Sequence, residues 1–389
     1  MLSPTRRFSP KWAIIYMLQV YFDFNATAPM RGVVIDAVNE VMAAGGNASS
    51  VHATGRAARA TVEKARASVA ALVGAERGWV IFCGSGTEAD NQVLRCAGAD
   101  TVLISAIEHE AVLLARSDAV RIPVGANGVI DLSLLEEALA ASKGKTLISV
   151  MAANNETGVL QPMKEISRLA RKYGSMFHTD AIQAAGKVSV DMAEWDVDFL
   201  SLSAHKIGGP QGVGALVARD RTLLNRFVHG GGQEGGLRAG TENVAGIAGF
   251  GAAAEAALDG LAEFGALAAL RDRLEEALIA IEPSIEVFGA DQARLPNTSK
   301  LATPGLTSET QVMGMDLAGY AISAGSACAA GRVEPPYVLT AMGVDDALST
   351  CAVRISLGWT TTADEIDGFV AEWSKLHARN RGRSARAAG

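Results

Sequence analysis

Cysteine is scarce in this chain, which has four among 389 residues. So few thiols cannot build a disulfide framework, and their spacing does not suit a zinc site. The four positions are Cys83, Cys96, Cys328 and Cys351. Such cysteine usage is typical of a reducing compartment, and we expect a cytoplasmic protein.

The chain also lacks an excess of positive charge and long apolar runs. Its 35 Lys and Arg stand against 42 Asp and Glu, a net charge of −7 at pH 7. This balance argues against nucleic acid as a partner. Because no apolar run reaches the roughly 18 residues of a membrane span, we expect no membrane association either. Residues 379–389 are basic and poor in apolar side chains, so we expect a disordered tail there.

Residues 1–20 weakly resemble a signal peptide, because Arg6 and Arg7 precede an apolar run at 12–20. A cleavage site of small residues does not follow that run. We therefore expect residues 1–20 to be a loose extension, with Met17 as an alternative start, in preference to a targeting segment.

What the chain does have is a repeated alternation of strand-like and helix-like segments. The predicted strands lie at 80–82, 102–105, 146–151, 176–179 and 198–202. Helical patterns between them include 164–173 and a helix opened by a capping box at Ser133 and Glu136. This order predicts an α/β fold with a mostly parallel, doubly wound sheet, on which 214–218 forms an antiparallel edge.

A second region follows the first. Residues 252–281 are rich in Ala, Leu and Glu and are predicted to be helical. The short strands after them lead to a last helix opened by a capping box at Thr362 and Glu365. We expect a large domain at 21–250 and a smaller α+β domain at 251–378, since the chain is long enough for two cores.

Lys206 follows the apolar run 199–202 and precedes a turn rich in Gly and Pro. An amine held at the end of a buried strand is desolvated, so its pKa falls and it becomes nucleophilic. A Schiff base with pyridoxal phosphate requires such an amine. A single lysine in a loop is more often a surface residue, so other segments must decide.

Several polar residues follow other predicted strand ends, where the sites of open α/β sheets lie. Gly86 and Thr87 begin a helix after a glycine-rich turn, and a helix N-terminus suits a phosphate, although such turns also merely connect elements. Ser203 and His205 are further phosphate candidates beside Lys206.

The strand at 176–179 ends in Asp180, whose carboxylate can keep a pyridinium nitrogen protonated. Gln183 and Asn155 can donate to the phenolic oxygen of the same ring, and His109 can stack on it and move protons. The alternatives are a helix-capping aspartate, ordinary turn residues and a structural histidine.

Cys328 lies between small residues, which favours a mobile segment with an exposed, reactive thiol over a buried structural one. Arg354 interrupts an apolar strand, and its planar guanidinium suits an α-carboxylate. The alternative is an arginine on the surface of an edge strand.

Taken together, these segments resemble the cysteine desulfurases, fold-type-I pyridoxal-phosphate enzymes of the nitrogen-fixation and housekeeping iron–sulfur class. The resemblance runs from about Tyr21 to about Asp367. The segments that carry it are 21–29, 46–52, 86–88, 108–109, 154–158, 178–183, 203–206, 238–243 and 325–328.

The resemblance implies that Lys206 carries the cofactor and moves protons with His109, while Asp180 supports the ring. Cys328 would take sulfur from L-cysteine as a persulfide, releasing L-alanine, and pass it to an iron–sulfur scaffold or another acceptor protein. It would also ligate a cluster iron transiently. Arg354 and Asn25 would bind the substrate. Residues implied to hold the cofactor are Lys206, Asp180, Gln183, Asn155, Gly86, Thr87, Ser203, His205 and, across a homodimer interface, Thr241.

Two departures and two alternatives accompany this resemblance. Gly235 stands where the family usually has arginine, and the turn 207–211 lacks the usual aromatic and basic residues, which predicts a softer turn. A selenocysteine lyase or another class-V enzyme is the first alternative, separable by whether Cys328→Ala spares selenocysteine turnover. A non-catalytic, scaffold-binding paralogue is the second; it predicts that the Schiff-base lysine is missing, whereas Lys206 is present.

Overall fold

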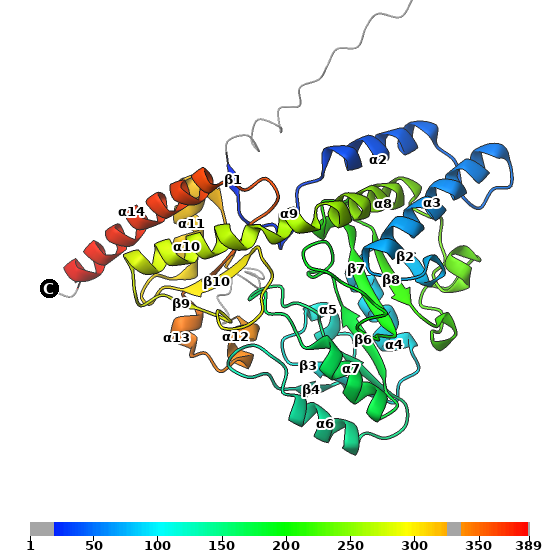
Figure 1. The fold of residues 1–389 in the computed structure, drawn as a ribbon, viewed down its shortest axis with the longest axis horizontal. Coiled ribbons are helices and arrows are strands. Elements are labelled where there is room, and N and C mark those ends of the chain that lie inside the picture. Colours follow the sequence, from blue (N-terminus) through cyan, green and yellow to red (C-terminus); the bar gives the residue numbers. More distant parts are fainter. Residues whose placement is uncertain (1–18, 325–335, 388–389) are drawn as a thin grey trace, which may run out of the picture.

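The computed structural model describes residues 19–324 and 336–387 (Figure 1). Its largest feature is a seven-stranded sheet with the order β2-β8-β7-β6-β5-β3-β4. The strands are β2 (Val80–Cys83), β3 (Thr101–Ser105), β4 (Val120–Ile122), β5 (Thr146–Ser149), β6 (Met176–Asp180), β7 (Phe199–Ser203) and β8 (Gly214–Ala218). Strands β7, β6, β5, β3 and β4 pair in parallel, which confirms the predicted α/β class.

The placement of β8 differs from the prediction. This strand is antiparallel, but it lies inside the sheet between β7 and β2. The edge is β2, whose four residues are all buried. Short strands of this composition suit either place, so their order in the sheet could not be inferred from their residues.

Helices cover both faces of this sheet because successive strand residues point in opposite directions. Val80 and Phe82 of β2 pack with α2 (Gly32–Ala44), α3 (Ala53–Leu72) and α8 (Val244–Asp259) in one core. Ile81 packs on the other side with α4 (Gly86–Cys96) and α5 (Glu110–Leu113). Helices α6 (Leu132–Ala141) and α7 (Met163–Lys172) extend the first layer.

A second, smaller core lies beside the sheet, around the antiparallel strands β12 (Ala352–Ser356), β10 (Thr298–Ala302) and β9 (Glu286–Val287) (Figure 1). Its helices include α10 (Leu267–Ile281), α11 (Ser308–Leu317) and α14 (Ala363–Ala387). The remaining elements are α9 (Leu261–Gly265), α12 (Tyr337–Ala341), α13 (Asp346–Ser349) and the 3-10 turns η1 (Arg77–Trp79), η2 (Ala204–Lys206), η3 (Arg221–Leu223) and η4 (Gln233–Gly236).

The N-terminal strand joins this smaller core although the sequence grouped it with the large sheet. β1 (Val20–Tyr21) pairs in parallel with β11 (Tyr320–Ala321), and Phe22 is fully buried among the small-core residues. Helix α8 crosses the expected boundary at residue 250, and breaks at 260 and 266 divide the predicted helix 252–281.

The capping box predicted at the start of the last helix is confirmed, whereas the one predicted at the start of α6 is wrong. Thr362 and Glu365 cap each other's backbone N–H groups, at 2.8 and 3.3 Å. The helix α6 begins earlier than predicted, because Asp131 accepts from the backbone of Ser133 and Leu134. Residues 379–387, expected to be disordered, continue α14.

Within the described part of the chain, no single helix is long and apolar enough to cross a membrane. One pair bent by 66°, Val244–Asp259 with Leu261–Ile281, meets the length and composition criteria together.

Candidate active site

A pocket of about 300 Å³ lies at the carboxyl ends of the parallel strands. It gathers every predicted site residue except Cys328 and Thr241. The gathered residues are Asn25, Gly86, Thr87, His109, Asn155, Asp180, Gln183, Ser203, His205, Lys206 and Arg354. They come from loops that follow separate strands, so a shared sheet edge brings them together.

Lys206 is held at the end of β7 by two backbone carbonyls. Its Nζ donates to Asn25 O at 2.7 Å and to Ala26 O at 2.8 Å. Burial lowers the pKa of this amine to about 8, and the positive charge of Arg354 acts in the same direction. The surface-lysine alternative is therefore wrong, since this amine faces a pocket and deprotonates more easily than an exposed lysine.

The N-terminus of α4 lies beside this amine in the pocket. Gly86 begins the helix, and a Cβ at this position would lie 2.1 Å from Ile182 Cδ1. Glycine therefore lets the bare N–H groups of the first turn approach the cavity wall. Ser203 and His205 line the same pocket, and burial lowers the pKa of His205 to about 4, so its ring is neutral at pH 7.

Asp180 ends β6, and its Oδ1 accepts from the N–H of Ile182 at 2.8 Å. Burial raises its pKa, whereas that N–H and the charges of His109 and Lys206 favour the carboxylate. His109 caps α5 by accepting from Ala111 N–H through Nδ1 at 3.1 Å, which leaves the proton of the neutral ring on Nε2. Both residues thus have structural roles and also line the pocket.

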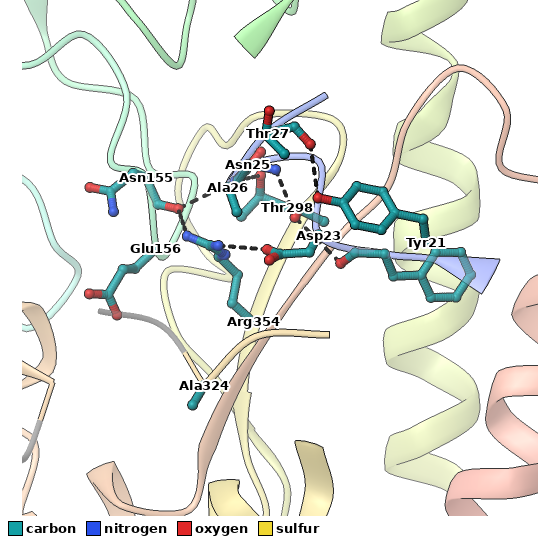
Figure 2. Close-up of polar contacts among 12 residues, drawn as sticks. Tyr21, Asp23, Asn25, Ala26, Thr27, Asn155, Glu156, Thr298, Ala324 and Arg354 are labelled. Atoms are coloured by element: carbon teal, nitrogen blue, oxygen red, sulfur yellow. Dashed lines mark hydrogen bonds and ion pairs between the residues drawn. The ribbon is translucent and has the colours of Figure 1, made fainter. Parts of the chain in front are cut away.

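Arg354 enters the pocket from β12 of the smaller core. Its guanidinium lies between two partners, Asp23 Oδ1 at 2.7 Å and Asn155 O at 3.0 Å (Figure 2). It is 5% exposed, so the surface alternative is wrong. Asn25 Nδ2 donates to Thr298 Oγ1 at 2.9 Å and to Asn155 O at 3.3 Å, which ties the first loop to both cores.

Two buried ionisable residues, one lining the pocket and one beside it, escaped the sequence analysis. Asp90 lies one helical turn after Gly86 on α4, is fully buried, and has its pKa raised by burial and by the charge of Asp180. Lys187 lies four residues after Gln183 and is also buried. The i, i+4 spacing from a predicted site residue was the available signal in both cases.

The structure does not bring Thr241 into the pocket. It is exposed and lines a separate hollow beside Cys83 and Arg238, so its role across a dimer interface stays a prediction. Cys328 lies outside the described residues. On either side of it, Ser323 pairs with Arg354 at 2.7 Å, and Tyr337 donates to Glu108 O at 2.7 Å. The described residues contain no cluster of three or more His, Cys, Asp or Glu suited to a metal.

The two departures have different surroundings. The turn 207–211 is braced, because Arg31 donates to Ile207 O at 3.3 Å and stacks on Trp359 at 3.8 Å. These contacts are made without the aromatic and basic residues that the family usually has in the turn, and its softness stays a prediction. Gly235 adopts a left-handed conformation with φ 66° beside Arg221, a backbone conformation that arginine rarely takes.

Comparison with known proteins shows to which family the chain with this pocket belongs. The aminotransferase class-V family profile matches residues 20–369. A cysteine desulfurase from Cereibacter sphaeroides is 43% identical over 366 residues, which cover 90% of this chain and 94% of that protein. The chain therefore belongs to the aminotransferase class-V family, and within it to the cysteine desulfurases.

Two solved structures of other proteins have a fold similar to that of this chain. A NifS-like protein from Rickettsia africae matches with a TM-score of 0.86 and 34% identity, covering 92% of this chain and 99% of that one. SspA, solved in complex with cysteine, matches with a TM-score of 0.75 and 30% identity over 87% and 98% of the two chains. Pyridoxal phosphate is the cofactor of this class, and the glycine cradle at Gly86, the buried amine and the buried Asp180 fit it.

Proposed function

We propose that this protein removes sulfur from L-cysteine, giving L-alanine and a persulfide on Cys328. The observation that carries the proposal is the Lys206 amine, which is held by two carbonyls, has a pKa of about 8, and shares a pocket with a helix N-terminus. The desulfurase relatives and the neighbour solved with cysteine support this substrate.

The pocket residues divide by what they can hold. Gly86, Thr87, Ser203 and His205 would bind the cofactor's phosphate, and Asp180 would face its ring nitrogen. Asn155 and Gln183 would face its phenolic oxygen. When bound, pyridoxal phosphate withdraws electrons from the substrate's Cα, which is the one contribution that side chains cannot make.

Lys206 and His109 would move the protons of the reaction. An amine with a pKa of about 8 is partly neutral near pH 7 to 8, so Lys206 can accept a proton from Cα and later return one. His109 reaches the pocket with its Nε2 side free of the helix-capping contact. Arg354 would bind the substrate carboxylate, with Asn25 shaping the wall beside it.

Cys328 would act as the nucleophile toward sulfur. Its thiolate forms a bond to the substrate sulfur while the bond between that sulfur and Cβ breaks, leaving the electron pair on carbon. A proton then completes the methyl group of alanine, and the enzyme keeps the persulfide. Atoms and electrons balance without an external oxidant, and a reductant or a protein thiol takes the sulfur afterwards.

We also propose a homodimer in the cytoplasm that delivers sulfur to an iron–sulfur scaffold or another acceptor protein. Thr241 is exposed and outside the pocket of its own chain, as a residue that serves a second copy would be. The exposed apolar side chains Ile35 and Met42, which lie two turns apart on one face of α2, offer a surface for that copy.

The test is to incubate the purified protein with pyridoxal phosphate, L-cysteine and a dithiol reductant. Sulfide and alanine should form in equal amounts, and both should fall by at least about a hundredfold in Cys328→Ser, which loses the nucleophile. Alanine formed without sulfide, or unchanged turnover in Cys328→Ser, would rule the proposal out. Selenocysteine turnover that survives Cys328→Ala would indicate a lyase instead.

A further inference from the structure

Lys187, in the loop after β6, is a second buried lysine beside the pocket, with 3% of its surface exposed. Its Nζ lies 2.7 Å from Asn25 Oδ1 and 2.6 Å from Gln183 Oε1. Among the described residues, Lys187 forms no ion pair with a carboxylate, whereas the equally buried Lys300 pairs with Glu156 at 3.1 Å. A buried amine whose described partners are two amide oxygens is a costly arrangement that a simple packing role does not explain.

The charges around Lys187 make this arrangement more unfavourable for a cation. Burial lowers the pKa of its amine well below the ordinary value, and the positive charges of Lys206 and Arg354 lower it further. A lysine used only for stability would gain more from a carboxylate partner. Because a carboxylate partner is lacking among the described residues, we look for the role of Lys187 in its two hydrogen bonds to amide oxygens.

Both contacts fix the direction of an amide group. The Lys187 Nζ has at least two N–H donors in either protonation state, and both amides turn their oxygens toward it and their nitrogens away. Gln183 Nε2 then points to Asn25 O at 3.0 Å, the same carbonyl that accepts from Lys206 Nζ at 2.7 Å. Asn25 is oriented alike, because Asn297 Nδ2 also donates to its Oδ1 at 3.1 Å.

We propose that Lys187 is a positioning residue that keeps the Gln183 amide turned with its N–H groups toward Lys206 and the pocket, where they can donate to the anionic ring oxygen of pyridoxal phosphate. The inference rests on the proposed function for its ligand. It concerns a residue that touches neither cofactor nor substrate and acts through Gln183.

The test is a double-mutant cycle of Lys187→Met, Gln183→Ala and the two combined, in the full-length protein after removal of bound cofactor. The first readout is the dissociation constant for pyridoxal phosphate, from absorbance titration. The second is the pH midpoint of the bound cofactor's visible absorption. Lys187→Met should weaken binding about tenfold, the effect of losing one hydrogen bond to a charged group. It should also raise the midpoint, because a ring oxygen that loses a donor makes the neighbouring proton harder to release.

The same Lys187→Met change in the Gln183→Ala background should weaken binding less than about twofold, since the residue through which it acts is gone. Lys143→Met, at an exposed lysine just before the amino end of β5 and so away from the pocket at the carboxyl ends, is the matched control and should change neither readout. If Lys187→Met fails to fold, as judged by circular dichroism, Lys187→Gln takes its place in the cycle.

Losses that multiply in the double variant would show that Lys187 acts independently of Gln183 and would overturn the inference alone. An unshifted midpoint in Lys187→Met with a normal cofactor affinity would overturn it as well. If the unaltered protein binds no pyridoxal phosphate, the proposed function falls together with this inference.

Discussion

Lys206 and Glu108 lie after different strands of the sheet, and burial moves the pKa of each to about 8 from opposite sides. The amine loses its proton more readily and the carboxyl holds its proton longer, because a charge of either sign is disfavoured away from water. The sequence placed Lys206 in the site from its position after an apolar run. It could not reveal Glu108 as a buried ionisable group, since polar residues after a strand are usually solvated, and for Asp90 and Lys187 the signal was their i, i+4 spacing from predicted site residues.

The pKa of Lys206 predicts how its reactivity depends on pH. In the cofactor-free protein, acylation of Lys206 by acetic anhydride, followed by mass spectrometry across a pH series, should reach half its maximum near pH 8. The physical reason is that only the neutral amine reacts. A midpoint near the ordinary lysine value of about 10.4 would contradict the buried, carbonyl-held geometry.

Glu108 predicts a dependence of stability on pH. Its Oε1 accepts from Ser105 Oγ at 2.5 Å and from Met151 N–H at 2.8 Å, and its pKa is raised to about 8 by burial. The folded carboxyl therefore stays protonated where the unfolded one is ionised, so this group's contribution to stability falls as pH rises from about 4.5 to about 8. Glu108→Gln, which cannot ionise, should be more stable than the unaltered protein by about 5 kcal/mol at pH 8.5 and equal to it at pH 4. Denaturant unfolding of the cofactor-free proteins at both pH values checks this, and equal stability at pH 8.5 would show that the carboxylate is tolerated.

At the scale of elements, the strands and helices around the site could be predicted to within a few residues, because hydrophobic patterns and glycine-rich turns mark them locally. The strand order could not, since β2 and β8 have similar apolar sequences and only their pairing distinguishes edge from interior. The start of α6 was misjudged because two capping residues, Asp131 and Ser133, stand close together in the sequence.

The junction of β2 with α4 gives a test at this scale. Gly86→Ala should weaken pyridoxal-phosphate binding at least about tenfold, because its Cβ would collide with Ile182 Cδ1 and move the first turn of α4. Removing that methyl group in Gly86→Ala/Ile182→Val should restore part of the affinity, while Ile182→Val alone should have little effect. Absorbance titration measures all three, and the absence of any rescue would mean that the collision is not the cause.

At the scale of the whole molecule, the site depends on both cores meeting at the first loop. Asn25, which follows β1, contacts Thr298 of the smaller core and the Lys206 amine of the larger sheet. Pairing between β1 and β11 joins residues about 300 positions apart, and a two-residue strand has no sequence pattern from which such a distant partner could be predicted. The sequence therefore led us to expect a large domain beginning at residue 21, whereas β1 and Phe22 belong to the smaller core.

The proposed homodimer makes its own prediction. Analytical ultracentrifugation should give about twice the 40.4 kDa of one chain. Replacing two exposed apolar residues on one face of α2, in Ile35→Asp/Met42→Asp, should lower the mass toward one chain, because buried charges without partners disfavour an interface. The matched control Leu317→Asp, at an exposed position on α11, should leave the dimer intact. An unaltered protein that sediments as a single chain at micromolar concentration would contradict the proposal.

The most direct measurement is borohydride reduction of the protein with bound pyridoxal phosphate, followed by peptide mapping. Two buried lysines, Lys206 and Lys187, lie near one another at the pocket, and only Lys206 lines it. We predict that the cofactor is fixed to Lys206 alone, and that Lys206→Ala leaves no labelled peptide. A label on Lys187, or none on any lysine, would contradict the account of this site.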